Sequence, residues 1–266
     1  MVDIQCHIAE TRRQLDDALR VRYQVFAEEL EYLEPARRFV PREVDPFDTL
    51  ETTIHLVACA GREPVGVVRL LAPNSEVIRS NGAVFGFDIE SKFDLSPLAG
   101  RGLRLVETMR YCVLARYRGR AVAAALHAAA VDLSRSAGIT HWIGCANTET
   151  DSLEDAHIIR RVAAHLGFEH GDIRIEPRAH AAAPLASRHT FYEAHERRRA
   201  NDDPAGLPFP RTLELYARRM AARFIGPPIY DVNFRMCSMP LLISVDEQLS
   251  GPARSPGPTG ERRIAA

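Results

Sequence analysis

The stretch LRLVETMRYCVLARYRGRA, residues 103–121, joins a strand pattern directly to a glycine turn and a helix start. Residues 103–114 form a continuous β-rich run, which is typical of a central strand covered on both faces. The segment Arg116–Ala121 follows, and an alanine-rich helix pattern then runs to Ser136. Backbone N–H groups at a helix start bind anions, and a glycine lets a phosphate approach the main chain. We therefore expect a strand, a phosphate-binding turn and a helix here. The alternative is a basic turn whose glycine only lets the helix begin.

The segments on both sides of this stretch alternate between helix and strand patterns. Thr11 and Gln14 fit a capping box, and Asp151 is a candidate helix cap. The predicted elements are a helix over 11–30, a hairpin of strands over 53–60 and 64–71, a long loop with one short helix over 72–102, a strand over 140–146, helices over 151–166, 187–200 and 210–223, and one or two strands over 231–245.

This order of elements predicts an α/β (α+β) fold with a mixed sheet. We expect one domain over residues 1–246, in which 170–210 form an irregular insertion or helical extension. Residues 247–266 are rich in Pro, Gly and Ser and have little to bury, so we expect a disordered tail.

Composition excludes several classes of function. The formal net charge of −1 gives no general attraction to nucleic acid or to anionic membranes. The five cysteines form no CxxC pair, and the ten histidines show no metal-ligand spacing, so we expect reduced thiols and no metal site. The N-terminus lacks the apolar core of a signal peptide, and we expect a cytoplasmic protein.

The loop REVDPFD, residues 42–48, places Glu43, Asp45 and Asp48 within six positions. Carboxylates this close repel one another, so the loop is either solvated or lies against cations. Arg22, Arg69 and Arg110 are the candidate partners, because arginine forks fix carboxylate geometry. Two readings of Asp45 stay open: it touches the substrate, or it only braces the arginines.

Three sets of motifs carry resemblances to known families. The strand, the R-x-x-G-x-A turn and the helix resemble the pyrophosphate loop of the GCN5-related N-acyltransferase (GNAT) superfamily. Arg22 with Phe26, the motif E-x-D-x-x-D at 43–48, Arg69 and the pair Glu107-x-x-Arg110 resemble the signature of N-acylhomoserine lactone synthases, which usually carry Trp where Tyr32 stands. The segments ITHWIGCANTETD and MAARFIGPPIYDVNF are similar to ornithine-lipid synthases and related long-chain N-acyl amino acid synthases. Residues 170–210 match nothing in these families.

The resemblance implies a GNAT-like, mostly antiparallel sheet flanked by helices, and it implies roles for particular residues. Glu107 would act as the base, directly or through water, with Glu43 as a second catalytic carboxylate. Cys112 and Val113 would offer a backbone N–H to the thioester oxygen. A buried strand cysteine is usually a small hydrophobe, so we do not expect a covalent role for the Cys112 thiol. The residues expected at the substrate are Arg22, Phe26, Asp45, Asp48, Arg69, Arg110, Cys112 and Val113, and those at the donor phosphates are Arg116, Arg118, Gly119, Arg120 and Ala121.

We therefore expect an N-acyltransferase that moves a fatty acyl chain from acyl carrier protein to the amine of an amino acid or similar small amine. No cofactor is permanently bound, and the donor thioester is carried on phosphopantetheine, in acyl carrier protein or acyl-CoA. The alternatives are an N-acylhomoserine lactone (autoinducer) synthase that uses S-adenosylmethionine, small-acyl transfer from coenzyme A, and a non-catalytic acyl-carrier-binding module. The run Glu196–Arg199 is a solvated helix face, or it contacts a carrier protein or the membrane periphery.

Overall fold

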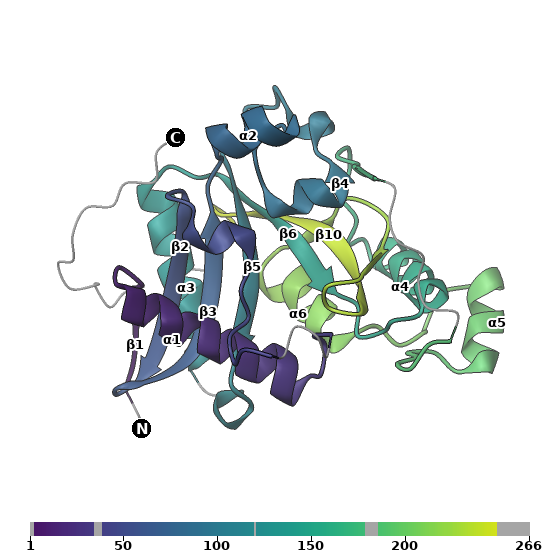
Figure 1. Ribbon diagram of the computed structural model, residues 1–266. Coiled ribbons are helices and arrows are strands. Elements are labelled where there is room, and N and C mark those ends of the chain that lie inside the picture. The colour runs from purple at the N-terminus through teal and green to yellow at the C-terminus, as the bar shows by residue number, and fades with distance from the viewer. Residues whose placement is uncertain (1–2, 35–38, 120, 179–185, 249–266) are drawn as a thin grey trace.

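A computed structural model of the chain describes residues 3–34, 39–119, 121–178 and 186–248. Its main feature is an eight-stranded sheet in the order β1-β2-β3-β5-β6-β10-β8, with β9 paired to β10 (Figure 1). The strands are β1 Ile4–Ile8, β2 Thr53–Ala60, β3 Glu63–Leu71, β5 Leu105–Val113, β6 His141–Asn147, β8 Arg223–Phe224, β9 Ile229–Asp231 and β10 Met236–Ser244, while β4 Phe93–Asp94 pairs with β7 Glu176–Pro177. Among the strand pairs of the described residues, only β5 with β6 is parallel, so the predicted mixed, mostly antiparallel sheet is confirmed.

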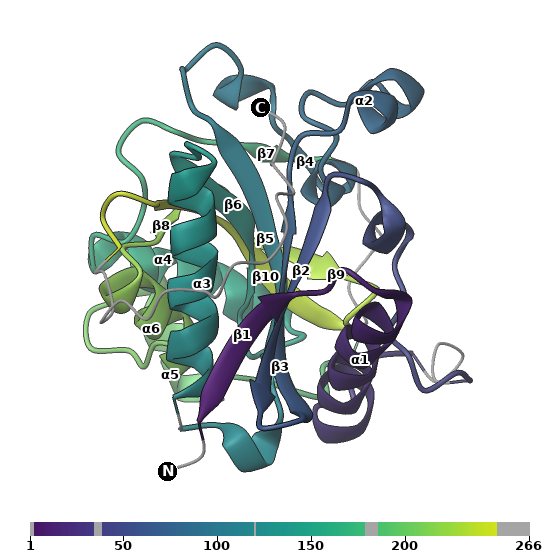
Figure 2. The same ribbon diagram turned by 90° about the vertical axis from the view of Figure 1, so that its left-hand side faces the viewer.

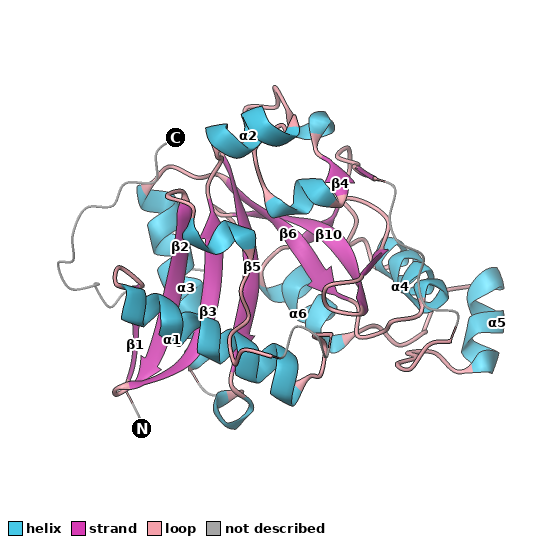
Figure 3. Cartoon of the chain, viewed as in Figure 1, coloured by secondary structure: helices cyan, strands magenta, loops and turns pink. Residues whose placement is uncertain are grey.

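Helices cover both faces of this sheet (Figures 2 and 3). The α-helices are α1 Arg12–Tyr23, α2 Ser75–Asn81, α3 Val122–Ser136, α4 Leu153–His165, α5 Ala194–Asp202 and α6 Arg211–Arg219. Helix α3 lies on one face and α1 on the other, and a π-helical turn, Gln24–Glu29, extends α1. The predicted capping box is present, because Thr11 accepts a hydrogen bond from the Gln14 N–H while the Gln14 side chain accepts from Thr11.

The face opposite α3 carries the segment between β3 and β5. This segment contains α2 and short 3₁₀ turns at Asp88–Ser91 and Ser96–Leu98, where a long loop with one short helix was expected. Its buried side chains form a second hydrophobic cluster with the sheet. The cluster includes Phe87, Ile89, Phe93, Leu95, Leu98, Ile143 and Leu242. Residues 72–102 therefore act as a cover over the central strands.

Several expected boundaries in the second half are wrong. Helix α5 begins at Ala194 instead of 187. Residues 187–192 are not helical, because their backbone N–H groups donate to the buried carboxylates of Asp151 and Asp155. Ser152, and not Asp151, caps α4, and the Asp151 carboxylate instead accepts from the backbone N–H groups of Arg188 and His189 at 3.0 Å. Asp155 accepts from the Phe191 N–H at 2.7 Å and from the Arg197 guanidinium at 2.6 Å.

The disordered tail was expected to begin at residue 247, but the chain is still ordered at Gln248. Gln248 is buried, and its side-chain amide donates to the carbonyl oxygens of Met220 and Ser244. Residues 249–266 lie outside the described residues.

Strands β5 and β6 meet at one end and separate toward the other (Figure 1). Their parallel pairing covers only Leu105–Glu107 and His141–Ile143. The next residue of β6, Gly144, lies so close to β5 that a Cβ there would sit 2.5 Å from the Thr108 carbonyl oxygen. The two strands are therefore in tight contact at this point and unpaired beyond it, which opens the centre of the sheet.

Gly144→Ala is expected to destabilise the protein by about 1–3 kcal/mol, because the added methyl group pushes β6 away from β5. Gly171→Ala is the matched control, because nothing lies within 4 Å of a Cβ at Gly171; its effect should stay within about 0.5 kcal/mol. Urea unfolding of both variants measures the difference. Equal stability of Gly144→Ala and wild type would contradict this close approach.

Candidate active site

A bulge in β5 places two expected site residues on the same face. Between the register pairs Arg69↔Met109 and Val67↔Cys112, two residues of β5 oppose Val68 of β3. Arg110 is the first bulged residue and has a left-handed φ of 56°. In a regular strand, residues three apart point to opposite faces. The bulge cancels this alternation, so Glu107 and Arg110 line the same cavity.

The three arginines and three carboxylates expected to meet do form one buried network. Arg22 donates to Glu43 at 2.5 Å and to both oxygens of Asp48 at 2.6 and 3.1 Å. Arg69 donates to Asp45 at 2.9 Å and to Asp48 at 2.7 Å. Arg110 donates to Asp45 at 2.8 Å and to Glu43 at 3.2 Å. Each arginine thus bridges two carboxylates, and the three charges of each sign balance.

The local sequence turns these carboxylates inward. Pro46 begins a 3₁₀ helix, Pro46–Thr49, for which Asp45 is the cap and accepts from the Phe47 N–H at 2.8 Å. Asp48 accepts in return from the Asp45 N–H at 2.7 Å. Proline has no N–H to satisfy at the first helical position, so it suits this turn. REVDPFD is therefore a compact capped turn and not a solvated loop.

Electrostatics hold the network ionised. The adjacent arginines lower the pKa of Glu43, Asp45 and Asp48, although burial alone would raise each pKa. His55 lies beside Asp48 and accepts no proton readily, because burial lowers its pKa to about 4. The turn that carries the three carboxylates is therefore fixed in one charge state at neutral pH.

Glu107 occupies a different environment. It is 1% exposed, and its oxygens accept from the backbone N–H groups of Asp88 at 2.7 Å and Ile89 at 3.1 Å. Burial, helped by the nearby Asp88 carboxylate, raises the pKa of Glu107 to about 8, despite the nearby cations Arg69 and Lys92. A carboxylate with this pKa exchanges protons near neutral pH, as a general base must.

Sequence reasoning missed the polar groups around Glu107. Lys92 lies on the cavity wall and forms an ion pair with Asp231 at 2.6 Å, which raises the pKa of the ammonium group. Phe234 stacks under the Arg110 guanidinium at 4.8 Å and meets Phe26 edge-on at 5.2 Å. Lys92 falls in a stretch without periodicity. Asp231 and Phe234 belong to the DVNF segment. The similarity of this segment to ornithine-lipid synthases was the signal that could have identified them as site residues.

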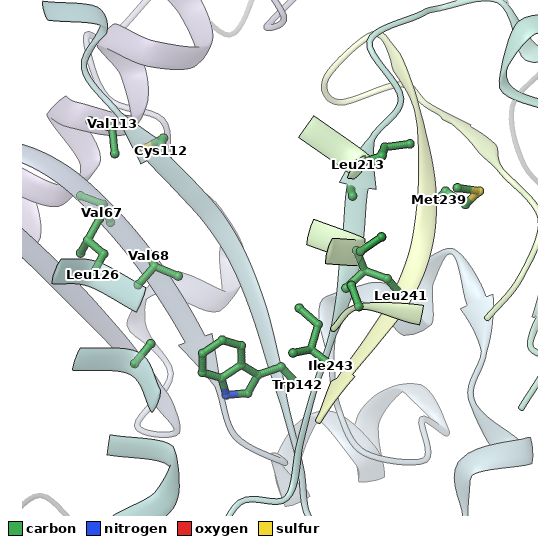
Figure 4. Close-up of a cluster of buried hydrophobic side chains, with 14 of the residues drawn as sticks. Val67, Val68, Cys112, Val113, Leu126, Trp142, Leu213, Met239, Leu241 and Ile243 are labelled. Atoms are coloured by element: carbon green, nitrogen blue, oxygen red, sulfur yellow. The ribbon is translucent and has the colours of Figure 1, made fainter. Parts of the chain in front are cut away.

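A cavity of about 530 Å³ passes through the opening between β5 and β6. On the face of α1 and the 72–102 cover, its wall carries the polar residues Glu107, Lys92, Asp231, Asn147 and Ser238. On the face of α3 and α6, the wall is mostly apolar. This apolar wall includes Val68, Ala130, Trp142, Tyr216, Met220, Leu241 and Ile243. Figure 4 shows Trp142 and Ile243 side by side there. One cavity therefore joins a polar chamber to an apolar chamber.

The wide end of the opening lies beside the expected phosphate turn. Gly119 has a left-handed φ of 74°, and α3 begins at Val122 after Ala121 without a side-chain cap. Arg116 pairs with Glu63 and Arg118 with Glu29, and Arg118 also donates to the Val113 carbonyl at 3.0 Å. Arg120 lies outside the described residues. Both described arginines thus have carboxylate partners on the protein.

Two β5 residues after the bulge differ in what they offer the cavity. The Leu114 N–H bonds to β3, and N–H groups alternate in direction along a strand, so the Val113 N–H faces the opening. The Cys112 N–H faces β3 by the same alternation. Burial raises the pKa of the Cys112 thiol to about 12, so this thiol stays protonated. Among the described residues, no three His, Cys, Asp or Glu side chains gather as metal ligands.

The network predicts a large effect for an isosteric change. Asp48→Asn removes one charge and leaves Arg22 and Arg69 undercompensated, so it should cost about 3 kcal/mol of unfolding free energy. Asp16→Asn is the control, because Asp16 forms partly exposed pairs with Arg20 and Arg42; its cost should be about 1 kcal/mol or less. Chemical denaturation at pH 7 gives both values.

The same network gives a pH dependence. A carboxyl whose pKa is lowered by folding contributes stability above its unfolded pKa, about 4, and this stability is lost as pH falls further. Wild type should therefore lose stability below about pH 4 more steeply than Asp48→Asn. Equal costs of the two substitutions at pH 7, with parallel acid profiles, would contradict a buried ionised network.

Comparisons with known proteins agree with this geometry. Residues 21–128 match the family model described as the Acetyltransferase (GNAT) domain. The L-ornithine N(alpha)-acyltransferase of Agrobacterium fabrum is 31% identical over 125 residues, which cover 43% of this chain and 40% of that protein. The enzyme of the same name from Rhizobium meliloti is 28% identical over 185 residues, 66% of this chain and 58% of that protein.

The chain thus spans about half the length of the curated relatives it matches. Among solved structures, FeeM, an N-acyl amino acid synthase from uncultured soil microbes, aligns with a TM-score of 0.52 at 10% identity, covering 92% of each chain. That likeness concerns the fold.

Among the described residues, none of the helices has both the length and the apolar character needed to cross a bilayer. Residues 21–128 are thus similar to the GNAT acetyltransferase domain, and the sheet has the fold of the FeeM structure.

Proposed function

We propose that the protein is an N-acyltransferase that moves a fatty acyl chain from a phosphopantetheine thioester to the amine of an amino acid. The observation that carries the proposal is the cavity through the sheet, with the buried carboxyl of Glu107 in its polar chamber and an apolar chamber on the opposite face. A reaction between a polar amine and a long acyl chain needs a polar binding site and an apolar binding site that meet at the thioester carbonyl.

The donor enters at the wide end of the opening. Gly119 and the backbone N–H groups at the start of α3, which no described side chain caps, suit the phosphate of the arm. The acyl chain extends between α3 and α6, where Trp142, Met220 and Ile243 line the wall. Burial of each methylene contributes about 0.8 kcal/mol, so this chamber favours a long acyl chain over an acetyl group. Acyl carrier protein is the donor we propose, with acyl-CoA as the other source of the same arm.

The reaction joins nitrogen to the carbonyl carbon and breaks the carbon–sulfur bond. The neutral amine attacks, and the thioester oxygen becomes an oxyanion that the Val113 N–H can stabilise. Glu107, as the carboxylate, takes the proton that the amine loses, directly or through water. Collapse of the intermediate expels the thiolate of the arm, which then takes up a proton. Glu43 is assigned a positioning role, because its lowered pKa and its two arginine partners make it a poor base.

The charges in the polar chamber favour a basic amino acid as acceptor. The arginine network is neutral, and Lys92 is matched by Asp231. Asp88, which lies 4.0 Å from Arg69, and the ionised form of Glu107 add two negative charges to this balanced set without a further cation. An acceptor with a side-chain ammonium group would balance this charge. The ornithine in the names of the matched relatives has such a group, and we propose an ornithine-like acceptor.

The main alternative is a lactone synthase that uses S-adenosylmethionine. Tyr32 stands on the cavity wall where those synthases usually carry Trp, and this difference favours the amino acid. A binding module without catalysis would retain the cavity but not the proton transfer at Glu107. The two experiments below separate these possibilities.

Glu107→Gln should lower kcat/KM by about 10²–10⁴, because the proton acceptor is lost while the side-chain volume is kept. In wild type, the base must be ionised, so kcat/KM should rise with pH through an apparent pKa of about 8. The variant should lose this inflection and retain only that of the amine. Glu169→Gln is the control, because Glu169 pairs with Arg160 and Arg174 and does not line the cavity. An unchanged profile in Glu107→Gln would remove Glu107 from the mechanism.

The product identifies the acceptor. Purified protein is supplied with acyl carrier proteins carrying acyl chains of 4 to 18 carbons, or with the matching acyl-CoA esters. Each donor is combined with ornithine, lysine, a neutral amino acid or S-adenosylmethionine. Mass spectrometry should detect an N-acyl basic amino acid, with long chains preferred. A lactone would establish the alternative, and the absence of every product would favour the binding module.

A further inference from the structure

The polar chamber contains a buried hydroxyl group, that of Ser238, to which the proposed reaction assigns no role. Ser238 is 8% exposed and lines the cavity, and within the described residues its Oγ atom has no hydrogen-bond partner. A buried hydroxyl without a partner costs about 1–3 kcal/mol. Such a group is usually explained by a ligand or water that completes it.

Two further neutral polar side chains, Asn147 and Tyr32, line the same cavity as Ser238. Ser238 lies opposite Asn147 in the β6–β10 pair, so the two side chains share one face. Asn147 accepts from the Glu149 N–H at 2.6 Å, and its side chain lies close to the Tyr32 hydroxyl. Tyr32, Asn147 and Ser238 all line the cavity.

These donors lie on the acceptor side of the opening. Alternation along β10 and its pairing with β9 put Ser238 on the face of Asp231, which binds Lys92. Helix α3 and the donor turn pack against the other face. Asn147 lies four residues beyond Ile143 in β6, where β5 and β6 no longer pair, so Ser238 lies opposite the unpaired part of β6.

The acceptor carboxylate has no unpaired cation to bind on the described cavity wall. Lys92 is paired with Asp231, Arg110 with Glu43 and Asp45, and Arg118 with Glu29. Neutral O–H and N–H donors can bind a carboxylate without adding charge to the chamber, and hydrogen bonds to an ionised group are the stronger ones.

We propose that the Ser238 hydroxyl, with Tyr32 beside it, binds the carboxylate of the amino acid acceptor and so selects amino acids over simple amines. This proposal rests on the proposed function. It makes Ser238 a specificity-determining residue of the acceptor chamber. It also explains the unpartnered hydroxyl as a group that is completed only when the acceptor is bound.

The test compares an amino acid with the amine formed by its decarboxylation. With L-ornithine and putrescine as acceptors, Ser238→Ala should lower kcat/KM for ornithine at least about tenfold, through a higher KM, and leave kcat/KM for putrescine and the KM of the donor unchanged. Tyr32→Phe should act in the same direction. Ser244→Ala, in the same strand but away from the cavity wall, is the control and should match wild type.

Stability supplies a second readout that needs no turnover. Removing an unpartnered buried hydroxyl should leave the melting temperature of the free protein unchanged or raise it, whereas removing a structural hydrogen bond would lower it. Ornithine should raise the melting temperature of wild type more than that of Ser238→Ala.

Three results would overturn the assignment of Ser238 while leaving the proposed function intact. They are an equal loss for both acceptors, which would place Ser238 at the thioester oxygen; a raised donor KM, which would place it at the arm; and no change at all. Absence of N-acylated product in wild type would instead reject the proposed function, and this inference with it.

Discussion

The separation of β5 from β6 is the constraint on which the rest of the structure depends. A sheet is normally closed along its whole length by backbone hydrogen bonds. Here the parallel pairing stops after Glu107 and Ile143, at the point where Gly144 lies against the Thr108 carbonyl. Beyond this point the backbone of β5 faces a cavity instead of a partner strand. The cavity at this opening has polar residues on one face of the sheet and mostly apolar residues on the other.

The arginine and carboxylate network keeps that opening in one shape. Six charged side chains from α1, the 42–48 turn, β3 and β5 are buried together, and each arginine joins two carboxylates. A buried ion pair often contributes little net stability, because both charges lose their hydration. Its geometry is specific, however, and this network fixes Arg110 and the bulge relative to the turn. Glu107, only three residues earlier, lies outside the network and is the carboxylate whose pKa is raised. The ion-paired Arg110 and the proposed base Glu107 are thus different kinds of charged residue within one strand.

Much of this arrangement was predictable from sequence, and the exceptions have physical reasons. The hairpin, the central strand, α3 and the capping box follow from strong local patterns, and the partners of REVDPFD followed from resemblance. The contacts of Asp151 and Asp155 were not predictable, because their backbone donors lie more than thirty residues away. The bulge at Arg110 has no local signal either, since a left-handed φ there would normally require glycine. Lys92 and Ser238 become site residues only when the cover and β10 are packed against the opening.

A crystal structure with a non-hydrolysable long-chain acyl-pantetheine thioether and ornithine tests the central claim most directly. The acyl chain should lie between α3 and α6 beside Trp142 and Ile243, and the amine should lie on the opposite face, within one water of Glu107. An acyl chain bound on the face of the 72–102 cover, or outside the opening between β5 and β6, would contradict the account.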